Sequence, residues 1–187
     1  MHDYLDIRLR PDPEFSAALL MSALFSKLHR GLIEAKQNQI GISFPKHDDN
    51  KPSLGDCLRL HGVLSDIEKL MALNWHRGMQ DHIQLKPIDQ VPEMAGFRVV
   101  QRVQVKSSVE RLRRRAIKHL DLSEAQALER IPDTREQRIK LPFVSIQSQS
   151  TGQRFRLFIK HSDLLAVPES GCFSHYGLSQ NATIPWF

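Results

Sequence analysis

The first hundred residues switch between two hydrophobic periods, and the order of the switches is the strongest constraint on the fold. Residues 4–9 alternate apolar and polar side chains, as a half-buried strand does, whereas residues 14–36 repeat apolar side chains at helical spacing. Two short strand-like segments follow, then a helical segment at 66–73 and a strand-like segment at 97–106. This is the order of elements in a ferredoxin-like unit, so we predict one here.

Local signals define the second helix of this unit. Ser65 precedes the helical segment and Glu68 follows three residues later, which predicts a capping box with Ser65 as the N-cap. Residues 76–83 predict one or two further helical turns before the last strand. We therefore expect residues 1–97 to form a ferredoxin-like (RRM-like) domain.

The rest of the chain, residues 98–187, predicts a smaller C-terminal α+β domain. An arginine-rich helix is expected at 108–120, and either Asp121 or Ser123 begins a second, shorter helix. The sequence Ser150-Thr-Gly152 is a hairpin signal between two strand-like segments, and the chain closes on a strand with an aromatic end. The predicted fold class is α+β throughout.

The sequence ERLRRRAIKHL predicts a helix with one cationic face. At 100° per residue the cations of this face lie within about 100° of one another, and His119 borders them. The face is either solvated or made for a polyanion. Residues 98–118 hold eight Arg or Lys and one acid, Glu110, which favours nucleic acid. The cations are Arg111, Arg114, Arg115 and Lys118, and the apolar side chains opposite them are Leu112, Ala116 and Leu120.

Candidate catalytic groups are few. His29 lies at the border of the apolar stripe of the long helix, where a histidine is either structural or able to titrate in a cleft. Ser145, Ser148 and Ser150 lie in one strand-like segment, and Ser148 and Ser150 share a face of it; these hydroxyls bind either phosphate and ribose or only water. No phosphate-binding glycine loop, hydrolase triad or carboxylate cluster occurs. We therefore expect any phosphodiester chemistry to need no metal and no cofactor.

The composition bears on location. No apolar run approaches the roughly 20 residues of a membrane span, and the charged first ten residues do not resemble a signal peptide. The two cysteines, Cys57 and Cys172, form neither a metal-ligand spacing nor a disulfide framework. We expect a cytoplasmic protein that does not associate with membranes.

A series of segments occurs in an order and spacing typical of one enzyme family. The segments are YLDIRLRPDPEF, FSKLHRGL, IGISFP, RVQVKSSVERLRRR, IPDT, LPFVSIQSQSTGQRFRLFI, YGLS and the final PWF. Together they resemble the type I-F CRISPR repeat-processing endoribonucleases over nearly the whole chain. The resemblance implies recognition of the stem-loop in CRISPR precursor RNA repeats and metal-independent cleavage at the 3′ base of the stem, without a cofactor.

The resemblance also implies partners. The enzyme is expected to remain on its product and become a subunit of the type I-F surveillance complex, and a phage-encoded inhibitor protein is a further candidate partner.

The resemblance assigns roles to single residues. It implies that His29 is the general base on the 2′-hydroxyl, that Ser148 holds this hydroxyl, and that Tyr176 positions His29. Ser150 is expected beside the scissile bond, and His175 has no assigned role. The residues expected to bind RNA are Arg102 and Gln104 at base edges, Phe155 stacked on the terminal base pair, and Arg111, Arg114, Arg115, Lys118 and His119 along the groove.

Two other functions fit the same pattern. A non-catalytic subunit of a ribonucleoprotein would grip the RNA hairpin without cutting it, and a structural subunit would use its basic helix on a protein. Only the nucleic-acid functions predict a steep loss of RNA affinity with salt, about 0.7–0.9 in log slope for each phosphate contact.

Overall fold

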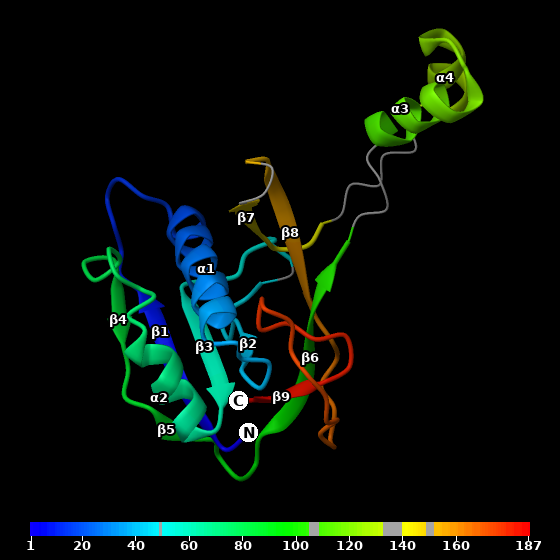
Figure 1. Cartoon of the computed structure of the whole chain (residues 1–187). Helices are drawn as coiled ribbons and strands as arrows, with labels where there is room; N and C mark the ends of the chain where they lie inside the picture. The colour runs from blue at the N-terminus through cyan, green and yellow to red at the C-terminus, as the bar shows by residue number, and fades with distance from the viewer. Residues whose placement is uncertain (49, 105–108, 133–139, 149–151) are drawn as a thin grey trace. The chain divides into compact units, whose positions relative to one another are not determined.

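The computed structural model describes residues 1–48, 50–104, 109–132, 140–148 and 152–187, with the backbone alone for Glu110 and Arg111 (Figure 1). The chain forms two compact units: residues 1–103 with 141–187, and residues 104–140. The predicted domain boundary after residue 97 falls inside a strand of the first unit, Gly96–Val103. The observed division therefore differs from the predicted one, although the α+β class is confirmed.

The first sheet has ferredoxin-like topology. Its strands pair antiparallel in the order β2-β3-β1-β4, the order that a split βαβ unit requires. Helices α1 and α2 pack against it (Figure 1). The predicted ferredoxin-like unit is thus confirmed. Its elements are β1 (Asp3–Leu9), α1 (Ala17–Glu34), β2 (Gly41–Ser43), β3 (Cys57–Gly62), α2 (Leu64–Ala72) and β4 (Ile83–Leu85), and the short β5 (Asp89–Gln90) also pairs with β1.

The fourth strand of this unit is not the predicted one. It is the three-residue β4, whereas the segment predicted at 97–106 belongs to the second sheet. The helical turns predicted at 76–83 are also wrong, because residues 73–82 form a series of turns that lead into β4. Asn74 and Gly78 have positive φ angles of 48° and 82°, a conformation that interrupts a right-handed helix.

The start of α2 also differs from its prediction. Val63 is the N-cap, so Ser65 lies inside the helix and no side chain of the N-cap residue accepts a hydrogen bond. Instead, the backbone N–H of Leu64 donates to the carboxylate of Asp3 on β1, at 2.9 Å. The carboxylate of Asp3 thus accepts the hydrogen bond that a local N-cap side chain was predicted to accept. The first N–H groups of a helix have no partner within the helix, so an acceptor from elsewhere in the chain can serve.

The second sheet is formed by strands from the C-terminal half of the chain, including its first strand and its last. It consists of β6 (Gly96–Val103), β7 (Phe143–Gln147), β8 (Arg154–His161) and β9 (Thr183–Trp186), in the order β7-β8-β6-β9. The β7–β8 hairpin and the final strand are confirmed predictions. Strand β7 is an edge of this sheet, and it packs along α1 (Figure 1).

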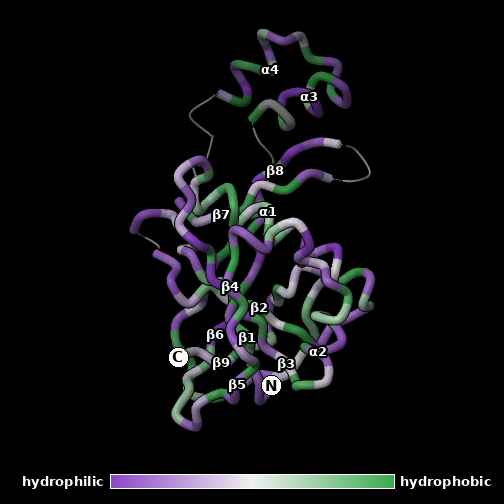
Figure 2. The backbone as a smooth tube through the Cα atoms, turned by 90° about the vertical axis from the view of Figure 1, so that its left-hand side faces the viewer, coloured by the Kyte–Doolittle hydropathy of each residue, from purple (hydrophilic) through white to green (hydrophobic). Residues whose placement is uncertain are grey.

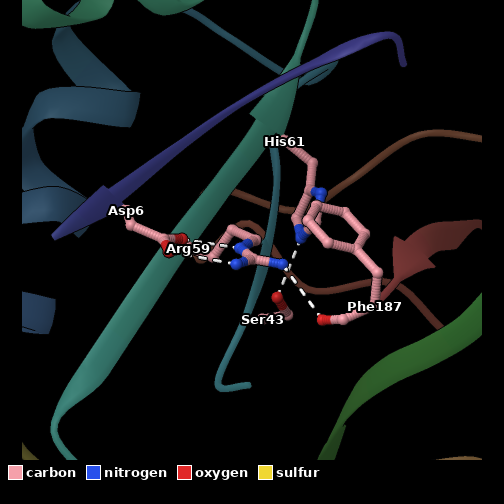
Figure 3. Close-up of polar contacts among 5 residues, drawn as sticks. All are labelled: Asp6, Ser43, Arg59, His61 and Phe187. Carbon is pink, nitrogen blue, oxygen red and sulfur yellow. Dashed lines mark hydrogen bonds and ion pairs between the residues drawn. The ribbon is translucent and has the colours of Figure 1, made fainter. Parts of the chain in front are cut away.

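The face of the first sheet that points away from the apolar core is buried. Asp6 and Arg59 lie directly opposite each other on β1 and β3. The Arg59 guanidinium donates two hydrogen bonds to the Asp6 carboxylate, at 2.6 and 3.0 Å (Figure 3). Phe187 covers this pair, with its ring 4.0 Å from the Arg59 guanidinium carbon. Ser43 and His61 share a 2.8 Å hydrogen bond beside them. RRM domains bind RNA on the open face of their sheet. Here the C-terminal segment occupies the equivalent face, so the likeness to RRM domains stops at the topology.

The second unit is a pair of helices, α3 (Val109–Leu120) and α4 (Glu124–Arg130). Both helices contain hydrophobic as well as hydrophilic residues (Figure 2). Ser123, one of the two predicted starts, caps α4 in a capping box with Gln126. The small core between the helices contains Val109, Ala116 and Ile131. Leu120, predicted on the apolar face of α3, is 53% exposed and is not part of this core. Ser108, the first residue of the helix predicted at 108–120, lies outside the described residues.

Candidate active site

His29 is held in one orientation by a distant part of the chain. It lies two-thirds along α1, half-buried, and its Nδ1 lies 2.8 Å from the backbone carbonyl oxygen of His175. A carbonyl oxygen only accepts, so Nδ1 donates and carries the proton of the neutral ring. The unprotonated nitrogen is therefore Nε2, which makes no hydrogen bond within the described part of the chain. This tautomer can accept a proton.

The ring of Tyr176 stacks on His29. The two ring centroids are 4.1 Å apart and the planes differ by 16°, while the same tyrosine ring stacks at 6.1 Å on Phe25, one helical turn earlier. The backbone of His175 and the side chain of Tyr176 thus fix the imidazole together. His175 had no predicted role, and its contribution comes from its carbonyl, which no sequence pattern indicates.

The surroundings of His29 keep it neutral. Burial lowers the pKa of its imidazole below the ordinary value of 6.5, and the nearby charges of His175 and Arg30 lower it further. The hydrogen bond to the His175 carbonyl raises the pKa, but by less than burial lowers it. At pH 7 the histidine is therefore mostly in the form that a general base requires.

A cavity of about 920 Å³ brings the predicted catalytic residues together. His29, Ser148 and Tyr176 all line it, and so does Phe155. Ser148 closes the β7–β8 hairpin, since its carbonyl accepts from Gly152 at 2.8 Å and its N–H donates to Gln153 at 2.9 Å. Ser150, the fourth predicted residue of this group, lies outside the described residues.

Helix α1 supplies a hydroxyl that joins the two walls of the cavity. The Ser22 hydroxyl donates to the carbonyl of Ala18 at 2.8 Å and accepts from the backbone N–H of Ser145 at 3.1 Å. That N–H belongs to the edge strand β7, so Ser22 attaches the hairpin to the helix that bears His29. Ser22 was not among the residues predicted to form the site. Its spacing of seven residues from His29, two helical turns, was the available signal.

Arg102, on β6, joins two aromatic rings at one side of this cavity. Its guanidinium carbon lies 5.8 Å from the Phe155 centroid and 5.7 Å from the Tyr176 centroid, within the range of cation–π attraction. Three residues with predicted RNA contacts or positioning roles therefore meet. Gln104, the predicted partner of Arg102, is exposed and belongs to the second unit.

The second unit presents the predicted cations to solvent. Arg114, Arg115, Lys118 and His119 are all exposed on α3, as the helical spacing predicts. Arg113 differs from them, because its Nε donates to the carbonyl of Ile131 at 2.8 Å and joins the two helices. For Arg111 the structure describes the backbone alone.

Residues 4–187 match the family model described as CRISPR-associated protein (Cas_Csy4), and the chain belongs to this family. It is 50% identical to the CRISPR-associated endonuclease Cas6/Csy4 of Pseudomonas aeruginosa (strain UCBPP-PA14) over 187 residues, 100% of both chains. It is 51% identical to the protein of the same name from Escherichia coli (strain UTI89 / UPEC), again over 100% of both chains. With relatives this close over its full length, the chain is an endonuclease.

Two further findings describe the chain. A solved structure of CRISPR endoribonuclease Cse3 bound to 19 nt RNA aligns with 100% of both chains at 12% identity and a TM-score of 0.40, a likeness too weak to add to the family assignment. In the described ranges, no helix is long and apolar enough to cross a membrane, and no three His, Cys, Asp or Glu side chains gather as a set of metal ligands.

Proposed function

We propose that this endonuclease is a metal-independent endoribonuclease that binds the stem-loop of CRISPR precursor RNA repeats and cleaves at the 3′ base of the stem. The observation that carries the proposal is the state of His29. It is a neutral imidazole whose Nδ1 is committed to a carbonyl and whose Nε2 is able to accept a proton, at the wall of a cavity with hydroxyls and cations. RNA carries its own nucleophile, so this set of groups suffices for cleavage.

The reaction uses the 2′-hydroxyl next to the scissile phosphate. Nε2 of His29 takes the proton of this hydroxyl, and the resulting oxygen attacks the phosphorus in line. The bond from phosphorus to the 5′ oxygen breaks, and that oxygen takes a proton from water. The products are a 2′,3′-cyclic phosphate and a 5′-hydroxyl. Ser148 holds the 2′-hydroxyl, Ser150 contacts the scissile region, and Tyr176 maintains the orientation of His29 through the observed ring stacking.

Recognition of the stem uses the aromatic and cationic residues. Phe155 stacks on the terminal base pair, which contributes about 1–3 kcal/mol and fixes the cleavage position. Arg102 and Gln104 read base edges at the foot of the stem, since Arg suits guanine and Gln suits adenine. Arg111, Arg114, Arg115, Lys118 and His119 follow the phosphates of the groove. The exposure of the four of these side chains that are described supports this role.

After cleavage the enzyme stays on its product as a subunit of the type I-F surveillance complex in the cytoplasm, and a phage-encoded inhibitor protein is a further proposed partner. These roles rest on family membership.

Cleavage in a chelator tests the reaction. Sequencing the RNA that co-purifies with the expressed His29→Ala protein identifies the uncut repeat hairpin. Wild-type protein is then incubated with this hairpin in excess EDTA. We expect full cleavage, with a 2′,3′-cyclic phosphate on the upstream product and a 5′-hydroxyl on the downstream one. A 5′-phosphate on the downstream product, or activity that appears only when a divalent metal is added, would contradict the proposal.

A further inference from the structure

The cavity extends well beyond the residues assigned to cleavage. Its wall on α1 runs from Leu19 to Ile33, fourteen residues apart, which corresponds to about 21 Å along a helix. Its other wall is the β7–β8 hairpin, and the Ser22–Ser145 hydrogen bond holds the two walls together. With about 920 Å³, the cavity lies near the upper end of the roughly 300–1,000 Å³ typical of ligand clefts. One ribose hydroxyl and one phosphate fill only a part of it.

The charge of the remaining space has one sign. Arg30 enters from α1, one residue after His29, and Arg154 enters from the start of β8. No Asp or Glu lines the cavity within the described ranges. Arg30 and Arg154 make no ion pair or hydrogen bond in the part of the chain that the structure describes, and both are exposed. Two cations without a neutralising acid, on facing walls of a cleft, attract an anionic chain.

The aromatic side chains of the cavity are confined to one region. Phe155 and Tyr176 lie with Arg102 beside His29, where the foot of the RNA stem is proposed to stop. The rest of the lining offers serine hydroxyls, aliphatic side chains, the amide of Gln147 and the two arginines. The two arginines of this surface can contact phosphates, and contacts to phosphates and sugars carry no sequence information, so the surface is suited to bind a strand without regard to its sequence.

We propose that this remaining space, the 3′ groove (Leu19, Ser22, Ser26, Arg30, Ser145 and Arg154), binds the single-stranded RNA on the 3′ side of the scissile phosphate. The inference rests on the proposed function. If the stem ends on Phe155 and His29 acts at the adjoining phosphate, the strand has to continue past His29. The 3′ groove begins there, and Arg30 and Arg154 contact the phosphates of the departing strand.

The test uses repeat hairpins that bind without being cut. Each hairpin carries a 2′-deoxy residue at the cleavage position, followed by either one or five uridines. The dissociation constant of wild-type protein is measured for both over a series of salt concentrations. We expect the five-uridine RNA to bind roughly tenfold more tightly at low salt, with a steeper salt dependence of about 0.7 in log slope for each added phosphate contact.

The variant pair Arg30→Gln and Arg154→Gln, combined in one protein, should remove this advantage, so that both RNAs bind equally and the log slope falls by about 1.4. Arg8→Gln is the matched control, because Arg8 is an exposed arginine on β1 that does not line the cavity. It should preserve the full advantage of the longer RNA. Thermal melting of each variant confirms that the fold is intact.

Two results would overturn the inference: equal binding of both RNAs by wild-type protein, or an unchanged advantage in the double variant. The outcome is separable from the proposed function. Wild-type protein that cuts the all-RNA hairpin but gains nothing from the uridines disproves the 3′ groove alone. Wild-type protein that leaves the all-RNA hairpin uncut disproves the proposed function itself.

Discussion

We expect His29→Ala to lower the single-turnover cleavage rate of the repeat hairpin by roughly 10²–10⁴-fold, the contribution of a well-placed general base, and to leave hairpin affinity nearly unchanged. The reason is the geometry of the ring. Its Nδ1 is committed to the His175 carbonyl, so Nε2 is the proton acceptor that alanine removes. The proposed stem contacts come from other residues, so binding does not depend on the imidazole. Rates and dissociation constants are both measured in EDTA.

The neighbouring histidine provides the matched control for this prediction. His175 holds His29 through its backbone carbonyl, and its own side chain is exposed. His175→Ala keeps that carbonyl, so cleavage should stay within a few-fold of wild type. A His29→Ala protein that cut at the wild-type rate would refute the assignment, and an equal loss in both variants would show that the effect is not specific to the imidazole of His29.

The pH dependence of the wild-type enzyme supplies a second readout for His29. In the proposed reaction the neutral imidazole of His29 is the active form, so we expect activity to be lost as the pH falls through its pKa and to be retained above it. Burial lowers this pKa below 6.5, so the acid limb of kcat/KM, which reports the free enzyme, should have its inflection below pH 6.5. An inflection above pH 7 would assign the limb to another group.

Asp6→Ala should destabilise the first unit by about 3–5 kcal/mol, because it removes the paired carboxylate of the buried Arg59 guanidinium and leaves it with the main-chain oxygen of Phe187, 3.2 Å away. The side chains of Asp6 and Arg59 are 8% and 10% exposed, and two hydrogen bonds of 2.6 and 3.0 Å join them. The measurement is denaturant unfolding followed by tryptophan fluorescence. Both tryptophans, Trp75 and Trp186, lie in the first unit and report on it alone.

An exposed ion pair and a compensated double variant provide the controls for Asp6→Ala. Lys46 and Asp56 form a 3.0 Å pair with half-exposed side chains, so Lys46→Ala should cost at most about 1 kcal/mol. Replacing both buried partners, Asp6→Leu with Arg59→Met, removes the unpaired charge and should recover most of the loss. A cost of Asp6→Ala no larger than that of Lys46→Ala would show that the buried pair does not stabilise the sheet.

The element order of the first unit was predictable because long periodic segments decide it. Its fourth strand was not predictable, since β4 follows a series of turns and has only three residues. A segment this short does not show a recognisable alternation of apolar and polar residues. The start of α2 was mispredicted for a related reason. Ser65 and Glu68 match a capping pattern, but the Asp3 carboxylate, brought near by the pairing of β1 with β3, satisfies Leu64 instead. Local signals do not contain contacts made across the sheet.

In the candidate site, too, the features that depend on local sequence were predictable and those that depend on distant contacts were not. From its own sequence His29 was only a border histidine, and the resemblance to a family supplied its proposed role. Its orientation depends on a carbonyl 146 positions away, which no local pattern reveals. The basic face of α3 was predictable because helical spacing alone places its cations together. Arg30 and Arg154 were missed because only the packing of α1 against the hairpin brings them to one cavity.

The central claim is that a 2′-hydroxyl of the RNA is the nucleophile and that His29 takes its proton. One experiment tests this claim most directly. Wild-type protein is incubated in EDTA with the repeat hairpin and with an otherwise identical hairpin that has a single 2′-deoxy residue at the cleavage position. We expect the all-RNA hairpin to be cut and the substituted one to be bound with similar affinity and left intact. Cleavage of both hairpins at equal rates would contradict the mechanism, and cleavage of neither would identify a protein that only binds the hairpin.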